Sequence, residues 1–217
     1  MGTIYFENKP RIIATGTIAG PKECAGVVGK YVDKTLSDDM FGESTYEKAE
    51  CKMLSYAISQ AMKNAKLQET DIDLLISGDL LNQIISASFA ARDFDFSFLG
   101  VYGACSTMAE SMAVGAAVVN SGYCKKIIAA TGSHFSSAER QYRYPLELGN
   151  TRPPQAQWTV TGAGGAVIAD MGGSNDKNCY PAITCATIGK VVDFGITDVN
   201  NMGAAMAPSG CNMVYTN

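Results

Sequence analysis

The most informative shortage in this 217-residue sequence is that of histidine, which occurs once, at His134. A metal or catalytic site that needs two histidines therefore cannot be assembled from this chain alone. The seven cysteines are scattered without a C-x-x-C pair, which argues against a disulfide framework or a zinc site. The pattern predicts free thiols in a reducing compartment, and we expect neither a metal nor a cofactor.

Charge and long apolar runs are also scarce. Charged residues make up 18% of the chain and the formal net charge is −4, with no cluster of lysine and arginine, so nucleic acid is not an expected partner. No apolar run reaches the roughly 18 residues of a transmembrane helix. The N-terminus lacks the basic and apolar regions of a signal peptide. These absences predict an intracellular globular protein.

Short strand-like stretches alternate with helical patterns along the chain. Strands are predicted at 11–20, 71–79, 96–104, 125–133 and 164–170, and helices at 44–67, 81–94 and 106–120. Ser44 and Glu47 predict a capping box at the first helix. Residues 134–161 show no clean period. The alternation predicts an α/β fold with a largely parallel sheet and helices on both of its faces.

A polar, glycine-containing stretch, MGGSNDKN, interrupts the pattern after residue 170. It predicts a first unit at 1–171, a linker at 172–180 and the beginning of a second unit at 181–217. The second unit should open with a strand near 181–191. The 37 residues from 181 to 217 are too few for an independent hydrophobic core.

Three chemically capable side chains stand where predicted strands end, namely Asp79, Cys105 and Ser133. Ligands of open parallel sheets bind at the carboxyl ends of the strands. Cys105 also precedes an apolar helix, whose unpaired amides and dipole favour an anion and lower the pKa of a thiol. Two interpretations stay open at this point: Cys105 fills space as a small apolar residue, or it faces a pocket.

The residues after Ser133 combine hydroxyls with cations. His134 follows at once, and Arg140 and Arg143 lie within the next ten residues. Such donors and cations suit a carboxylate ligand, although a solvated polar loop would have the same composition. For Asp79, capping of the next helix is an alternative to a role in binding.

The order of these motifs resembles a known family. A strand, GAC and a buried helix, then a Ser/His loop with AER and a GAGGAVI strand, resemble the N-terminal half of the thiolase-like fold. The segments TIAGPKECAGVVGKYVDKT, DIDLLISGDLLNQ, YGACSTMAE, AERQYRYP and GKVVDFGITDVNNMGAAMAP are similar to the stage V sporulation protein AD family of endospore-forming bacteria. The resemblance implies a complete N-terminal half and a mostly missing C-terminal half, as in a truncated sequence.

The resemblance also implies a function. Members of this family are expected to bind dipicolinic acid (pyridine-2,6-dicarboxylate) within the machinery that takes it into the developing spore, using a thiolase-like pocket without catalysis. The implied partners are other stage V sporulation membrane proteins, which would hold the protein at the forespore inner membrane, and a second copy in a homodimer. The resemblance implies Cys105, Ser133 and His134 as ligand-binding residues. With those expected from position and chemistry, the predicted set is Asp79, Cys105, Ser106, Ser133, His134, Arg140 and Arg143.

Two other functions compete with this one. In a condensing or thiolytic enzyme acting on acyl-CoA or acyl-carrier substrates, Cys105 would be the nucleophile, and His134 would be the sole histidine available as a base. In a structural subunit, the pocket would be vestigial.

Overall fold

The protein is seen in a computed structural model that describes residues 2–142, 159–172, 179–198, 203–204 and 206–207. Its strands are β1 (Gly2–Tyr5), β2 (Arg11–Ala19), β3 (Lys34–Thr35), β4 (Leu74–Asp79), β5 (Ser97–Gly100), β6 (Lys126–Ser133), β7 (Gly162–Ala169) and β8 (Cys185–Ile188). Its α-helices are α1 (Pro21–Cys24), α2 (Tyr46–Ala65), α3 (Ile85–Ala91), α4 (Thr107–Asn120) and α5 (Phe135–Tyr142). Short 3-10 turns occur at Gly29–Tyr31, Glu69–Asp71 and Ala104–Ser106.

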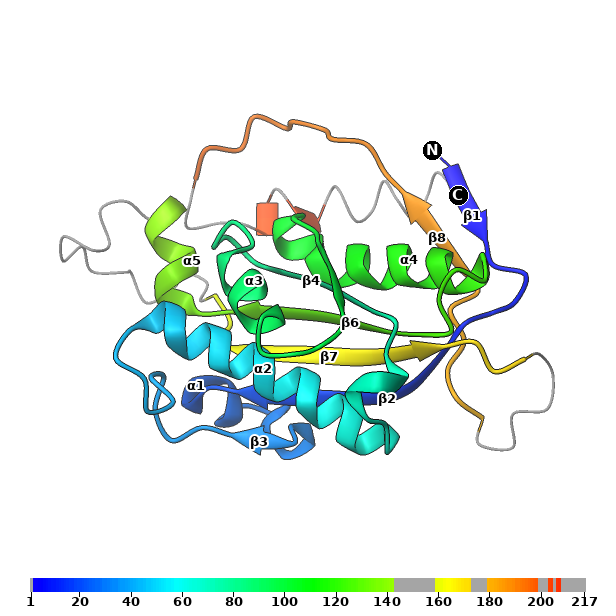
Figure 1. Cartoon of the computed structure of the whole chain (residues 1–217). Helices are drawn as coiled ribbons and strands as arrows, with labels where there is room; N and C mark the ends of the chain where they lie inside the picture. Colours follow the sequence, from blue (N-terminus) through cyan, green and yellow to red (C-terminus); the bar gives the residue numbers. More distant parts are fainter. Residues whose placement is uncertain (1, 143–158, 173–178, 199–202, 205, 208–217) are drawn as a thin grey trace.

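A six-stranded sheet forms the centre of the molecule, with the order β3-β2-β7-β6-β4-β5 (Figure 1). β4 pairs in parallel with both β5 and β6, whereas β7 runs antiparallel to its neighbours β2 and β6. The sheet is therefore mixed. β1 and β8 form a separate antiparallel pair, in which Gly2 lies opposite Ile188 and Tyr5 opposite Cys185.

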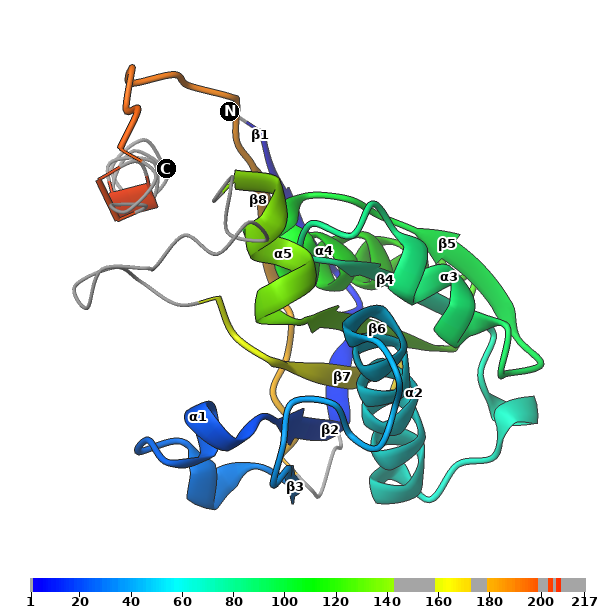
Figure 2. The same ribbon diagram turned by 90° about the vertical axis from the view of Figure 1, so that its left-hand side faces the viewer.

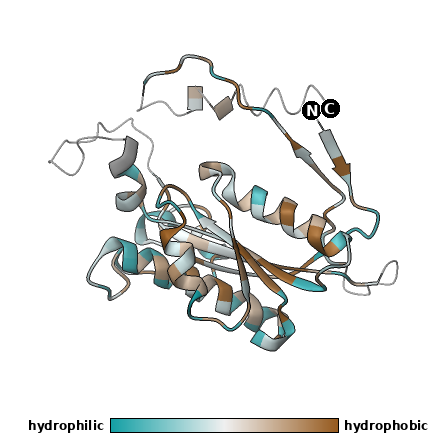
Figure 3. Cartoon of the chain, turned by 45° about the horizontal axis from the view of Figure 1, so that its top comes forward, coloured by the Kyte–Doolittle hydropathy of each residue, from teal (hydrophilic) through white to brown (hydrophobic). Residues whose placement is uncertain are grey.

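Helices cover both faces of the sheet, as the alternating pattern predicted. α2 and α3 pack on one face and α4 packs on the other (Figure 2). Neighbouring residues of β6 show the two-residue period, because Ile128 belongs to the cluster with Leu54 and Ile58 of α2, while Ile127 belongs to the cluster with Val119 of α4. Figure 3 shows apolar residues gathered in the strands and along α4.

α2 can lie close to the sheet because Gly16 has no side chain. A Cβ atom at Gly16 would lie 2.3 Å from the carbonyl oxygen of Ala57, well inside van der Waals contact. On the opposite face, α4 buries Thr107, Ser111 and Val119 and leaves much of its other surface half-exposed. The apolar composition of α4 thus does not make it buried on all sides among the described residues.

The structure corrects four details of the sequence analysis. β7 is antiparallel, so the sheet is not largely parallel around it. The segment after Ser133, in which no element was predicted, begins with α5, and β1 was not predicted either. The N-cap of α2 is Thr45 and not Ser44: the Thr45 hydroxyl accepts a hydrogen bond from the Lys48 amide at 3.3 Å.

Candidate functional site

Cys105 lies in the short turn that precedes α4. Its position depends on Gly78 in β4, because a Cβ atom there would lie 2.1 Å from the Val101 carbonyl oxygen. The loop after β5 can therefore lie against the end of β4, where the Val101 amide donates to the Ser77 carbonyl at 3.0 Å. Ala104 next to Cys105 has a left-handed φ of 49°, which is uncommon for a residue with a side chain. The exposed thiol of Cys105 therefore lies on a turn whose position is fixed by close backbone contacts with β4.

A cavity of about 620 Å³ lies at the carboxyl ends of β4 and β6. Cys105 and Ser133 both line it, together with Leu80, Leu81 and Val160. A second hollow of about 460 Å³ is also lined by Cys105, together with Ser106 and residues of the segment after β8. The structure therefore brings Cys105 and Ser133 to one cavity and places Ser106 at the neighbouring one.

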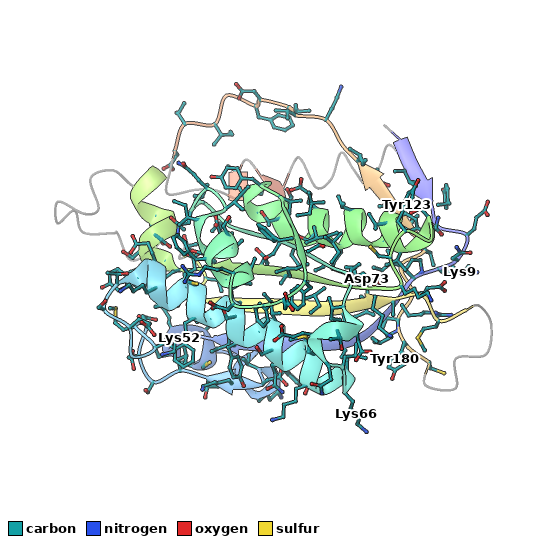
Figure 4. The ribbon with its side chains drawn as sticks, viewed as in Figure 1. Lys9, Lys52, Lys66, Asp73, Tyr123 and Tyr180 are labelled. Atoms are coloured by element: carbon teal, nitrogen blue, oxygen red, sulfur yellow. The ribbon has the colours of Figure 1, made fainter. Side chains whose placement is uncertain are left out.

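The wall of the larger cavity is mainly apolar. Its described lining includes no lysine, arginine or histidine. Lys9, Lys52 and Lys66, labelled in Figure 4, lie around the outside of the molecule. Ser133 donates its hydroxyl hydrogen to the Val160 carbonyl at 2.6 Å, so this hydroxyl can serve a ligand as an acceptor in that arrangement.

The start of α4 offers backbone donors, since Ser106 at the N-cap makes no side-chain hydrogen bond to the first amides of the helix. Glu110 of the first turn opposes an anion there. Its buried Oε2 atom lies so close to Gly103 that a Cβ atom on that glycine would be 2.5 Å away. The helix end is therefore a weaker anion site than the sequence suggested, because a carboxylate offsets the dipole.

His134 lies outside the cavity lining and is fully buried. Its Nδ1 accepts from the Ser136 amide at 3.2 Å, so Nε2 is the nitrogen that donates to the Asp39 carbonyl at 3.0 Å. Burial lowers the pKa of His134, and the Asp39 carbonyl works in the opposite direction. The ring packs against that of Tyr46 in a tilted arrangement, with centroids 4.8 Å apart. The contacts of His134 are those of a neutral residue that fixes the loop before α5.

The other predicted residues have varied outcomes. Asp79 is fully buried and does not line the cavity, whereas the two leucines that follow it line the wall. Arg140 belongs to α5, but its side chain lies outside the described residues, as does the whole of Arg143. Sequence reasoning missed Val160, for which no local signal exists, and Leu80 and Leu81, which their position after the strand end could have indicated.

Comparison with known proteins assigns the family. The family model for stage V sporulation protein AD matches residues 1–217. The chain belongs to this stage V sporulation protein AD family. Stage V sporulation protein AD of Bacillus subtilis (strain 168) is 43% identical over 212 residues, which cover 98% of this chain and 61% of that relative. The chain thus spans less than two thirds of the length of the relative.

Solved structures show the fold of this family member to be thiolase-like. Cerulenin-bound OleA of Xanthomonas campestris matches with a TM-score of 0.53 at 12% identity, over 77% of this chain and 58% of that one. A 3-oxoacyl-(acyl carrier protein) synthase III of Xanthomonas oryzae pv. oryzae matches with a TM-score of 0.51 at 13% identity, over 77% and 57%. At these identities the likeness concerns the fold alone.

Three further observations concern the part of the chain that the structure describes. Within it, no group of three or more histidine, cysteine, aspartate or glutamate side chains could hold a metal ion. None of its helices combines the length and the apolar character that crossing a bilayer requires. All six cysteines in this part are free thiols, as predicted.

Proposed function

We propose that this member of the stage V sporulation protein AD family binds dipicolinic acid in the cavity beside Cys105, as part of the uptake of this compound into the developing spore. The observation that carries the proposal is that Cys105 and Ser133, which follow different strands, line one cavity. A cavity of about 620 Å³ is within the range of small-molecule sites.

The chemistry of the cavity suits the two parts of this ligand. The mainly apolar wall, with Leu81 and Val160, can contact the flat pyridine ring. The carboxylates need hydrogen-bond donors and positive charge. Backbone amides at the start of α4 can supply donors, and Arg140 and Arg143, which follow the cavity residue Ser133 in sequence, are the proposed cations.

Replacement of Cys105 distinguishes binding from catalysis. Cys105→Ser should bind dipicolinate with nearly unchanged affinity, because the hydroxyl is close in size to the thiol and still offers a polar hydrogen. Cys105→Ala should weaken binding modestly, by about 1 kcal/mol, the usual net value of one hydrogen bond. Calorimetric titration of the full-length protein measures both changes.

The competing function is a condensing or thiolytic enzyme with Cys105 as the nucleophile. Cys105 is exposed at the start of a helix, as that function needs. Both ring nitrogens of His134, however, are engaged by backbone groups outside the cavity. Acyl-CoA turnover by the wild type that disappears in Cys105→Ser would overturn the binding function, because a serine hydroxyl lacks the thiolate nucleophile.

The proposed partners are other stage V sporulation membrane proteins, which would place the protein at the forespore inner membrane, and a second copy of the chain. β5 supports the homodimer, since it is an edge strand with all four residues exposed, including Phe98 and Leu99. Exposed apolar edges of this kind commonly pair with another strand.

A charge on this edge should separate the two copies. We expect Leu99→Lys in the full-length protein to shift the sedimentation coefficient from that of a dimer to that of a monomer, because two like charges would face each other across the interface. Tyr123→Lys, at a more exposed position away from β5, is the control. A Leu99→Lys protein that remains dimeric would exclude β5 from the interface.

A further inference from the structure

A cluster of five polar side chains, hereafter the buried polar cluster, lies close to residues of the cavity wall and has no part in the function proposed so far. Its members are Glu50 of α2, Asp79 of β4, Asn82, Ser86 of α3 and Ser137 of α5, all of them at most 5% exposed. Among the described residues, neither carboxylate of the cluster has an ion-pair partner. Two uncompensated buried charges would be costly, so the cluster must hold at least one proton.

The hydrogen bonds indicate which carboxylate holds that proton. The hydroxyl of Ser137 has one hydrogen, yet its oxygen lies 2.6 Å from Glu50 Oε2 and 3.2 Å from the His134 carbonyl oxygen. If Glu50 were ionised, two acceptors would compete for that hydrogen. If Glu50 is neutral, its own hydrogen goes to Ser137, and Ser137 donates to His134. The neutral acid therefore satisfies every group in this chain of hydrogen bonds.

The surroundings of the two carboxyl groups agree with this assignment. The pKa of Glu50 is raised to about 7: burial is the largest cause, the charge of Asp79 adds to the rise, and the hydrogen bonds with Ser137 and Ser86 oppose it. Burial also raises the pKa of Asp79, but the backbone amides of Ile84 and Asn82 oppose that shift. A neutral Asp79 would have no acceptor for its hydrogen among the described residues, because neither of its carboxylate oxygens has a hydrogen-bond partner, whereas a neutral Glu50 can donate to Ser137.

Other titratable groups near Glu50 have separate roles. Glu47, one turn earlier on α2, adds a small repulsion. On the side of α5, Glu139 accepts a hydrogen bond from the Thr159 amide at 2.9 Å, and His134 directs its ring to Asp39. The side chain of Arg140 lies outside the described residues.

The buried polar cluster supports both walls of the cavity. The His134 carbonyl that Ser137 reaches also accepts the Ala138 amide at 3.0 Å, and it directly follows the cavity residue Ser133. Asp79 directly precedes Leu80, which also lines the cavity and whose amide donates to the Gly132 carbonyl at 3.1 Å. Ionisation of Glu50 would break the first connection and place a second charge near Asp79.

We propose that Glu50 is a positioning residue that, as a neutral acid, holds the cavity walls at Ser133 and Leu80 in the arrangement that binds the ligand. The inference rests on the proposed function, because it assigns a pH dependence to binding in that cavity. If only the neutral form binds, and its population halves near pH 7, affinity should fall about ten-fold between about pH 6 and about pH 8.

Calorimetric titration of the full-length protein with dipicolinate tests this dependence. The wild type should lose about ten-fold in affinity over that range. At every pH in this range, Glu50→Gln should have the affinity that the wild type has at about pH 6, because an amide donates to Ser137 as the neutral acid does. Glu47→Gln, the control from the same helix, should behave like the wild type. A Glu50→Gln protein with the pH profile of the wild type would overturn the proposal.

Amide hydrogen exchange at Ala138 and Leu80 provides a readout that needs no ligand. The ratio of the wild-type rate to the Glu50→Gln rate cancels the intrinsic effect of pH. We expect the ratio to rise several-fold from about pH 6 to about pH 8 as the walls loosen. If no variant binds dipicolinate but the ratio rises, the proposed ligand is wrong and the role of Glu50 stands. A constant ratio would refute the role of Glu50 whatever the ligand is.

Discussion

Replacing Arg140 and Arg143 together by glutamine should reduce dipicolinate affinity by about a hundred-fold or more. The described lining of the cavity contains no cation, and Glu110 and Asp193 add negative charge close to Cys105. A dianion in this cavity therefore depends on cations from elsewhere in the chain. Two charge-assisted hydrogen bonds, each worth about 1.5–3 kcal/mol, account for the expected loss.

The matched control removes the same charge from another place. Lys48 and Arg92 line a groove between α2 and α3 that shares no residue with the cavity. Lys48→Gln combined with Arg92→Gln should leave affinity within about two-fold of the wild type, because distant exposed charges are screened by salt. Calorimetry of both double variants at one ionic strength makes the comparison. Equal affinities in the wild type and the Arg140/Arg143 double variant would remove these arginines from the site.

Glu50→Gln should also change how stability depends on pH, in the complete absence of ligand. The pKa of Glu50 is raised from 4.5 to about 7 on folding. At a pH below 4.5, Glu50 carries the proton in both the folded and the unfolded chain. Between the two values only the unfolded chain releases it, so the free energy of unfolding falls as pH rises and then levels off. The loss from this one group is about 3 kcal/mol.

Glutamine does not titrate, so the variant lacks this loss. The unfolding free energy of Glu50→Gln minus that of the wild type should therefore increase by about 3 kcal/mol from about pH 4.5 to above pH 7. Urea titrations at several pH values measure the difference, and other titrating groups cancel between the two proteins. Glu47→Gln serves again as the control. A difference that stays constant with pH would mean that Glu50 titrates alike in the folded and unfolded chain.

Much of the fold could be predicted because the sequence alternates strand and helix patterns with distinct periods. The proximity of Cys105 and Ser133 could be predicted, because both stand at the carboxyl ends of strands that run parallel; β5 and β6 flank β4, and both residues line one cavity. The direction of β7 could not be predicted, because no local pattern states which way a strand runs.

The parts of the site that were not predicted depend on side-chain direction and tertiary packing. His134 is adjacent to Ser133, but successive residues of an extended chain point to opposite sides, so one lines the cavity and the other is buried against Tyr46. Glu50 looks in the sequence like an ordinary polar residue of α2. Glu50 is buried by tertiary packing, in which the sheet, α3 and α5 all lie against α2.

The position of β7 between β2 and β6 has a consequence for the order in which the protein can fold. During synthesis, β2 emerges at residues 11–19 and β6 at 126–133, but the strand that joins them emerges only at 162–169. Until then β2 and β6 each expose an unpaired edge, and α2 is the described helix that packs on both. The sheet therefore closes late and through contacts distant in sequence, which favours slow folding and leaves a nascent chain that can aggregate through its strand edges.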